Sequence, residues 1–265
     1  MGPVIDLLVM DYFIICLAAL ITSLLTFFSG FGLGTILTPV FAIFFPIEVA
    51  IALTGVVHFL NNIFKLALVG SKADKSVVSR FGIPAFFAAI VGAYLLVKLN
   101  SLMPLYSYTI GQRSFLVTPV KVIVALLLIF FALMEVVPAL KRLQVGKNLI
   151  MGGILSGFFG GLSGNQGALR SAFLINANLN KEAFIATGVV IACIVDFSRL
   201  GVYLARFSQA DLQKNATLII AATCSAFAGA FLGSKLLKKV TMKPVQITVT
   251  VMLILLSIAL ASGLL

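Results

Sequence analysis

GFFGGLSGNQGALRSAFLINANLN, residues 157 to 180, sets five glycines and several polar side chains among apolar residues. One mostly apolar run, Leu149 to Leu162, leads into its polar centre, and a second, Ala168 to Ala177, follows it. At about 1.5 Å per residue, helices over these runs are roughly 21 and 15 Å long, shorter than a hydrocarbon core of about 30 Å. Neither predicted helix spans a membrane alone.

The polar centre between these runs, Ser163-Gly164-Asn165-Gln166-Gly167, interrupts the helix. Irregular backbone at membrane depth is tolerated only where it is buried in protein or lines a cavity. We therefore predict a re-entrant hairpin over residues 149–177, with the interruption at its tip. The second short helix starts there with its backbone N–H groups exposed and with Arg170 close by, an arrangement that suits an anion.

Composition places the whole chain in the membrane. Of 265 residues, 61% are hydrophobic and 10% charged, and the mean hydropathy is +1.18, which predicts an all-α integral membrane protein without a soluble domain. Lys and Arg exceed Asp and Glu by 19 to 8, an excess that we assign to cytoplasmic loops and not to nucleic-acid binding. With three dispersed cysteines and one histidine, neither a disulfide framework nor a metal or cofactor is predicted.

A similar pattern occurs in the first half. Residues 12–28 and 35–45 are apolar and flank Ser29-Gly30-Phe31-Gly32-Leu33-Gly34, which predicts a first hairpin over residues 12–45. Three spanning helices are predicted after each hairpin. They cover residues 49–69, 81–97 and 116–140, and then residues 183–205, 216–237 and 245–265, with a long loop over residues 98–114.

The two halves repeat at an offset of 133. Residues 48–57, EVAIALTGVV, align with residues 181–190, KEAFIATGVV. Ser29-Gly30 and Gly34 match Ser163-Gly164 and Gly167 if one residue is lost in the tip. We therefore predict two repeats, residues 1–140 and 141–265, each a re-entrant hairpin plus three transmembrane helices.

The basic residues indicate the topology. If each hairpin enters and returns on the same side, eleven basic residues fall on one side of the membrane: Lys72, Lys75, Arg80, Lys141, Arg142, Lys147, Lys181, Lys235, Lys238, Lys239 and Lys243. Five fall on the other: Lys98, Arg113, Lys121, Arg206 and Lys214. If each hairpin crossed once, the division would be even. The uneven division obeys the positive-inside rule. We therefore predict inverted repeats, as in many secondary transporters, with both termini on the outer side of the cell membrane.

These features resemble the TauE/SafE family of sulfite exporters. The resemblance rests on the two Gly-rich tips, Ser29 to Pro39 and Gly157 to Gly167, each followed by an Ala-x-x-x-Thr pattern, Ala50 to Thr54 and Ala183 to Thr187. It implies an inner or plasma membrane transporter of sulfite, sulfonates or other small organic anions, usually directed outward and coupled to an ion gradient. The second tip is more polar than the glycine tips typical of the family.

Arg170 is the first candidate for substrate binding. Its planar guanidinium matches two oxygens of a sulfonate or carboxylate, and the alternative is a structural pairing with Asp196 or hairpin carbonyls. The tips supply the neighbouring candidates, Ser163, Gly164, Asn165, Gln166 and Gly167 in the second and Gly30, Gly32 and Gly34 in the first.

Three further ionisable residues lie within predicted membrane segments. Burying a charge there costs free energy, so such residues usually have a charged partner or face a cavity. Asp196 and Arg199 are three residues apart on one helix face, which suits either a structural ion pair or a proton-coupling carboxylate. Lys65 aligns with Ser198 in the second half and either lines a positive cavity or extends to the interface.

Polar residues on the helix after the first hairpin complete the candidate set. His58, Asn61 and Asn62 either bond neighbouring helices together or line the cavity. Thr54 and its counterpart Thr187 either reach the tips or bond back to their own helices. Thr38-Pro39 predicts a helix start with Thr38 as the cap.

The sequence therefore predicts a secondary transporter of small anions, with H⁺ or Na⁺ as a candidate coupling ion and a homodimer left open. An anion channel is the alternative, and an intramembrane enzyme is disfavoured because neither a nucleophile with its base nor a metal motif is found.

Overall fold

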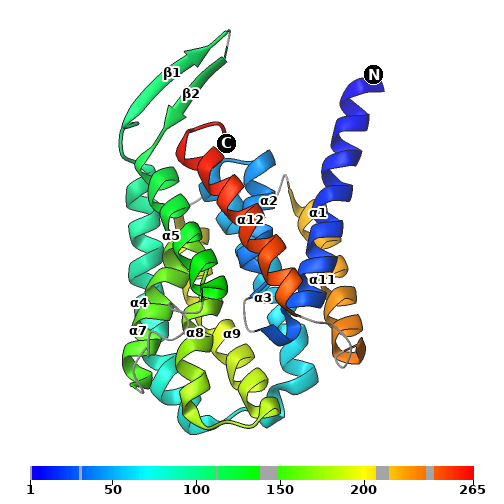
Figure 1. Cartoon of the computed structure of the whole chain (residues 1–265), viewed down its shortest axis with the longest axis vertical. Coiled ribbons are helices and arrows are strands. Elements are labelled where there is room, and N and C mark those ends of the chain that lie inside the picture. Colours follow the sequence, from blue (N-terminus) through cyan, green and yellow to red (C-terminus); the bar gives the residue numbers. More distant parts are fainter. Residues whose placement is uncertain (1, 30–31, 112, 138–147, 207–214, 237–241) are drawn as a thin grey trace.

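The computed structural model describes residues 2–29, 32–111, 113–137, 148–206, 215–236 and 242–265, and most of them are helical (Figure 1). The helices of the first half are α1 (Gly2–Ser29), α2 (Gly34–Phe44), α3 (Ile47–Val69), the short 3-10 turn η1 (Gly70–Lys72), α4 (Lys75–Asn100) and α5 (Pro119–Val136). Those of the second half are α7 (Leu149–Ser163), α8 (Gly167–Leu174), η2 (Ile175–Ala177), α9 (Lys181–Arg206), α11 (Ala216–Leu236) and α12 (Met242–Ala261).

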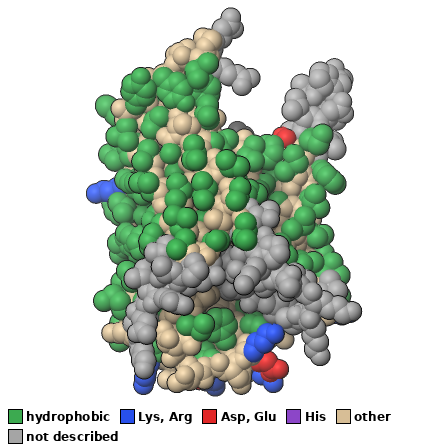
Figure 2. All heavy atoms as spheres, viewed as in Figure 1, with side chains coloured by type: hydrophobic (Ala, Val, Ile, Leu, Met, Phe, Trp, Pro, Cys, Tyr) green, Lys and Arg blue, Asp and Glu red, His purple; other side chains and the backbone are tan. Residues whose placement is uncertain are grey.

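The described helices form a multi-pass membrane protein. Four of them are long and apolar enough to cross a bilayer, within the ranges Ile47–Lys72, Lys75–Asn100, Lys181–Ala205 and Ala216–Lys235. Hydrophobic side chains cover the described middle of the face in Figure 2, and Lys and Arg gather at its lower end. Such an apolar band with a charged end is typical of a protein surrounded by lipid.

Both hairpins contain a helix break at a glycine. In the second, α7 ends at Gly164, whose φ of 79° lies in the left-handed region that favours glycine, and α8 begins three residues later. In the first, Gly32 has a φ of 85° just before α2. The α7–α8 pair lies in the lower half of Figure 1, while α1 starts at the upper end.

The first arm of the first hairpin differs from the prediction. We expected a short helix over residues 12–28, but α1 has 28 residues and is about 42 Å long at 1.5 Å per residue. The predicted arm covered only the apolar run, and the helix starts earlier and includes Asp6 and Asp11 because an aspartate does not interrupt helical backbone as proline does. Pro39 was also misinterpreted, since it lies inside α2 and Thr38 is no cap.

The loop predicted over residues 98–114 is partly a β-hairpin. Strands β1 (Tyr106–Ile110) and β2 (Arg113–Val117) pair antiparallel, with Tyr108 opposite Phe115 and their stacked rings 5.3 Å apart. The Tyr108 hydroxyl donates a hydrogen bond to the Ser262 carbonyl over 2.6 Å, which ties the hairpin to the end of α12. The fold is therefore helical with one exposed β-hairpin, and the prediction of an all-α chain was incomplete.

Small residues let α7 lie against α4. A β-carbon added at Gly153, Gly157 or Gly161 would lie 2.1 to 2.2 Å from a backbone oxygen of α4. Gly229 of α11 has the same relation to α1, with the Leu20 carbonyl oxygen 2.1 Å from the added atom. Close backbone approach through small residues is the usual packing of membrane helices.

The helix contacts occur in matched pairs. The α4–α7 contact corresponds to α11–α1, α4–α9 to α11–α3, and α12–α2 to α5–α8, while α3 packs on α9 and α5 on α12. These matches follow from aligning α1–α2 with α7–α8, α3 with α9, α4 with α11 and α5 with α12. The α3–α9 pair brings the two halves together at the tips.

Candidate functional site

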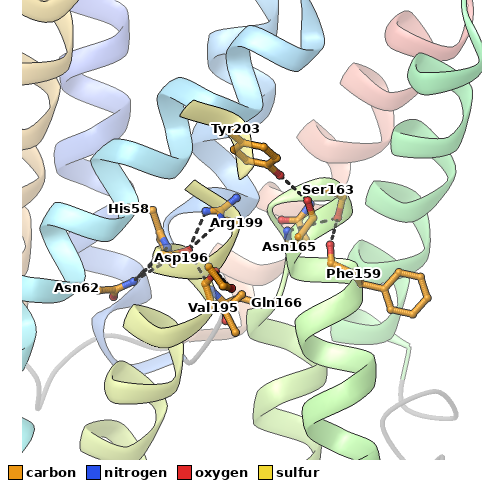
Figure 3. A network of polar contacts seen from close by, with 12 residues as sticks. His58, Asn62, Phe159, Ser163, Asn165, Gln166, Val195, Asp196, Arg199 and Tyr203 are labelled. Carbon is orange, nitrogen blue, oxygen red and sulfur yellow. Dashed lines mark hydrogen bonds and ion pairs between the residues drawn. The ribbon is translucent and has the colours of Figure 1, made fainter. Parts of the chain in front are cut away.

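Asp196 of α9 is the centre of a buried polar network (Figure 3). One carboxylate oxygen, Oδ2, lies 2.6 Å from His58 Nδ1 and accepts a hydrogen bond from Asn62 Nδ2 over 3.1 Å. The other, Oδ1, accepts from Gln166 Nε2 over 3.2 Å and from Arg199 Nε over 3.0 Å. Arg199 Nη2 is also 2.9 Å from Oδ1. One carboxylate therefore joins α3, α9 and the tip of the second hairpin.

Helical spacing places these groups together. His58 and Asn62 are four residues apart on α3, and Asp196 and Arg199 are three apart on α9, so each pair lies on one helix face. Gln166 lies at the end of the tip because Gly164 turns the chain between α7 and α8. The Gln166 carbonyl also accepts a hydrogen bond from Ser156 Oγ over 3.1 Å, which fixes the tip against α7.

Arg170 connects to the same network through a neutral residue. Its Nη1 donates to Gln166 Oε1 over 3.4 Å, and a β-carbon added at Gly188 of α9 would lie 3.5 Å from its Nε. Gln166 thus bonds to Arg170 on one side and to Asp196 on the other, and Asp196 bonds to Arg199. The side chains of both arginines are buried.

A cavity lies on the Arg170 side of this network. It is small, with about 30 Å³ of space open to the centres of water-sized molecules. Its lining consists of Thr26, Gly32, His58, Asn62, Lys65, Arg170, Ser171, Leu174, Phe184, Ile185, Gly188 and Val189. Two of these residues, Lys65 and Arg170, are cationic, and none of the twelve is acidic. The residues that the structure brings together around this space suit a small anion.

On the second side of the network, the described residues of the two hairpin tips approach each other closely. A β-carbon added at Gly164 would lie 3.1 Å from Arg199 Nη1 and 3.5 Å from Thr38 Oγ1. A β-carbon added at Gly34, the first residue of α2, would lie 2.9 Å from the Gly164 carbonyl oxygen and 3.8 Å from a methyl carbon of Thr54. The two hairpins therefore touch each other here, next to Arg199.

The remaining predicted residues have mixed placements. The Thr187 hydroxyl accepts a hydrogen bond from the Asp74 backbone N–H over 2.9 Å, so it bonds neither to a tip nor to its own helix in that contact. Ser163 Oγ donates to the Phe159 carbonyl over 2.9 Å. Gly167 is the first residue of α8, and Gly30 lies outside the described residues. Asn61 accepts a hydrogen bond from Ser23 Oγ of α1 over 3.2 Å, as expected of a residue that bonds helices together.

Three small or polar lining residues were not among the predicted site residues. These are Thr26, Ser171 and Gly188. Two of them could have been noticed from the internal repeat, because at the offset of 133 Ser171 aligns with Thr38 and Gly188 aligns with Gly55. Thr26 lies near the end of the predicted first arm and carried no signal in the sequence.

Comparison with known proteins identifies the family. No curated protein and no solved structure matches the chain. A family model described as sulfite exporter TauE/SafE matches residues 15–260, nearly the whole length, including both hairpins and the cavity residues. This family consists of membrane transporters of sulfite and related anions. The chain belongs to the TauE/SafE sulfite exporter family.

Proposed function

We propose that this chain is a secondary transporter of small oxyanions, exporting sulfite, sulfonates or other organosulfur and carboxylate anions. The observation that carries the proposal is the cavity between the two halves, lined by Lys65 and Arg170 and by no acidic residue. Arg199 is paired with Asp196, so Arg170 leaves one positive charge in excess among these buried groups when His58 is neutral, and Lys65 adds a second when it is protonated. An oxyanion that entered the cavity would reduce that excess, which is a physical reason for binding it.

The transport mechanism that we propose is alternating access between inverted repeats. Its support is the matched helix contacts, the helix break in each hairpin and the contact between Gly34 and the Gly164 carbonyl. Transporters of this plan bind substrate where broken helices meet near the bilayer midplane. The positive-inside rule places the end with Lys72, Lys75 and Arg80 in the cytoplasm, and both chain ends lie at the other end in Figure 1. The cavity would then be the cytoplasmic entrance of an exporter in the inner or plasma membrane.

Within the cavity we assign Arg170 to the oxyanion, with His58, Asn62 and the first tip at Gly32 beside it. Asp196, Arg199 and Lys65 form the group that would respond to a coupling ion, H⁺ or Na⁺. Asp196 is placed for such a role because it touches His58, Gln166 and Arg199 together. A structural ion pair between Asp196 and Arg199 has the same geometry, so coupling is a question for flux measurements.

Uptake of radiolabelled sulfite by proteoliposomes tests the proposal. We expect Arg170→Ala to reduce uptake by a factor of about 100 or more, because the anion loses charge-assisted hydrogen bonds in a buried site. Arg80→Ala, which removes the same charge from an exposed position on α4, is the control and should transport as the wild type does. Equal uptake by wild type and Arg170→Ala would remove Arg170 from the site. Currents far above carrier turnover in bilayer recordings would indicate a channel.

Thermal-shift measurements narrow the substrate class. Purified wild-type protein is screened against sulfite, thiosulfate, methanesulfonate and acetate, and stabilisation should appear for the anions that fit. Because a ligand stabilises the folded state by mass action, the concentration dependence of each shift ranks the affinities. Arg170→Ala should lose the shift while it keeps the melting temperature of the anion-free protein.

A further inference from the structure

The second side of the polar network contains an unusual group of buried polar atoms. Thr38 Oγ1, Thr54 Oγ1 and both amide atoms of Asn165 have no hydrogen-bond partner among the residues that the structure describes. The Arg199 guanidinium, which approaches Thr38 at Gly164, interacts with Asp196 and with the Tyr203 hydroxyl. Each of these residues is more than nine-tenths buried. Buried polar atoms are normally paired, because an unpaired one loses its bonds to water without replacement. A cluster of them next to a guanidinium calls for a ligand.

These atoms surround the tip of the second hairpin. Arg199 Nη1 and Thr38 Oγ1 approach the same point above Gly164, and Asn165 is the next residue along the chain. Ile51 Cγ2 lies 3.9 Å from that point. The guanidinium rests against α3 at Gly55, where an added β-carbon would lie 3.5 Å from both Arg199 Cζ and Nη2. Glycine at these positions leaves the guanidinium and the backbone of the tip close together.

Part of this arrangement recurs at the cavity when the offset of 133 is applied, although the arginines are not matched, since Arg170 aligns with Leu37 and Arg199 with Leu66. Thr38 corresponds to Ser171 and Ile51 to Phe184, both of which line the cavity. Gly55 corresponds to Gly188, which lies against Arg170. The tips exchange roles, since Gly32 of the first tip lines the cavity and Gly164 of the second lies against Arg199.

We propose a second oxyanion subsite at Arg199, bounded by Thr38, Asn165 and Gly164 and related in part to the Arg170 cavity by the internal repeat. This subsite rests on the transport function proposed above. It is closed in this structure by the contact between Gly34 and the Gly164 carbonyl, and it opens when the two tips separate. The anion passes from Arg170 across Gln166 to Arg199, where the Thr38 hydroxyl and the Asn165 amide donate hydrogen bonds to its oxygens. Asp196 keeps Arg199 in position through Oδ1.

The decisive variant is Thr38→Val, which removes one hydroxyl and changes the side-chain volume little. If Thr38 only packs, the variant is neutral or stabilising, since the lost hydroxyl had no partner, and sulfite transport is unchanged. If the subsite exists, the maximal rate of radiolabelled sulfite transport in proteoliposomes falls about tenfold to a hundredfold, because a hydrogen bond to a charged ligand is lost. Sulfite binding at the Arg170 cavity, followed by thermal shift in detergent, stays within about threefold of wild type.

The matched control is Thr223→Val on α11. Its hydroxyl is also buried without a hydrogen-bond partner among the described residues, yet Thr223 neither lines the cavity nor neighbours Gly34 or Gly164. Its transport rate should equal that of wild type. Wild-type rates for Thr38→Val, or equal losses in both valine variants, overturn the subsite and leave the Arg170 site standing. Absence of sulfite transport by the wild type overturns the proposed function itself and the subsite with it.

A second variant, Asn165→Asp, places a carboxylate at the tip, on the residue after Gly164, which lies against Arg199 Nη1. It competes with the anion for the guanidinium, so the loss of transport should exceed that of Thr38→Val. Asn165→Ala separates the two effects, because it removes the amide without adding charge. A transport rate for Asn165→Asp above that of Asn165→Ala would contradict an oxyanion at this position.

Discussion

Gly55 and Gly188 occupy matching positions in the repeated Thr-Gly-Val-Val sequence, and each lies against an arginine. The two arginines differ in how their charge is balanced. Arg199 is paired with the carboxylate of Asp196, whereas Arg170 bonds to the neutral amide of Gln166 and faces the cavity. Each of the two similar segments thus places a glycine against a guanidinium, and Asp196 makes Arg199 part of the protein's own network.

This difference also separates stability from ligand binding. Asp196 and Arg199 lie on the same helix, so their pair joins no helices, but removing one partner leaves a buried charge uncompensated and destabilises the fold. Arg170 lines the cavity, so we expect a change at Arg170 to affect mainly transport. The two sides of the network should respond differently to substitutions that leave the arginines in place.

The largest effect is expected from Asp196→Ala. Removal of one partner of a buried ion pair leaves Arg199 uncompensated and should lower the free energy of unfolding by about 3–5 kcal/mol. The corresponding change beside Arg170, Gln166→Ala, removes the hydrogen bonds of a neutral side chain to Asp196 and Arg170 but leaves the Asp196–Arg199 ion pair in place, so it should cost less, about 1.5–3 kcal/mol. SDS titration of the purified proteins, followed by circular dichroism, measures both.

The double variant Asp196→Ala with Arg199→Met controls this comparison. It removes both charges, so most of the lost unfolding free energy should return. If Asp196→Ala destabilised the protein no more than Gln166→Ala does, the distinction drawn between the two arginines would be wrong.

A smaller difference is expected between Gly188→Ala and Gly55→Ala. The β-carbon added by Gly188→Ala has ordinary contacts, since Arg170 Nε is 3.5 Å away, and alanine in a helix interior gains about 0.5–1 kcal/mol over glycine. At position 55 the added carbon lies 3.2 Å from Leu200 Cδ2, which must shift and offset that gain. Unfolding free energies by the same SDS titration should therefore rank Gly188→Ala above Gly55→Ala, and the reverse order would indicate that the Arg170 side is the more tightly packed.

Much of this architecture was predictable because membrane helices can be recognised in a sequence from the length and apolarity of their segments. The helices α3, α9 and α11 start and end within a few residues of the predicted ranges, and Gly34 and Gly167, aligned in advance, each begin the second helix of a hairpin. Glycine at a helix break is visible in sequence because few other residues tolerate the left-handed backbone found at Gly32 and Gly164.

Other features depend on tertiary contacts that no local pattern encodes. Helical spacing predicted the ion pair of Asp196 and Arg199, but the contact of Asp196 with His58 joins residues 138 positions apart. Thr187 bonds to the backbone of Asp74 because η1 packs against α9, a contact between the two halves. The β-hairpin was missed for a different reason, since residues 98–114 were predicted only as a long loop.

The smallest effect is expected at the ion pair between Lys72 of η1 and Glu182 in the first turn of α9. Their charged atoms are 3.3 Å apart, as close as many buried pairs, but the side chains are 62% and 73% exposed. Water and salt screen such a pair, so Glu182→Gln should change the free energy of unfolding by no more than about 0.5–1 kcal/mol, and less in high salt. SDS titrations at low and high ionic strength measure this change beside that of Asp196→Ala. A loss as large as that of Asp196→Ala would mean that the contact between η1 and α9 contributes to stability as much as the buried network. The two ion pairs would then contribute equally to stability in spite of their different burial.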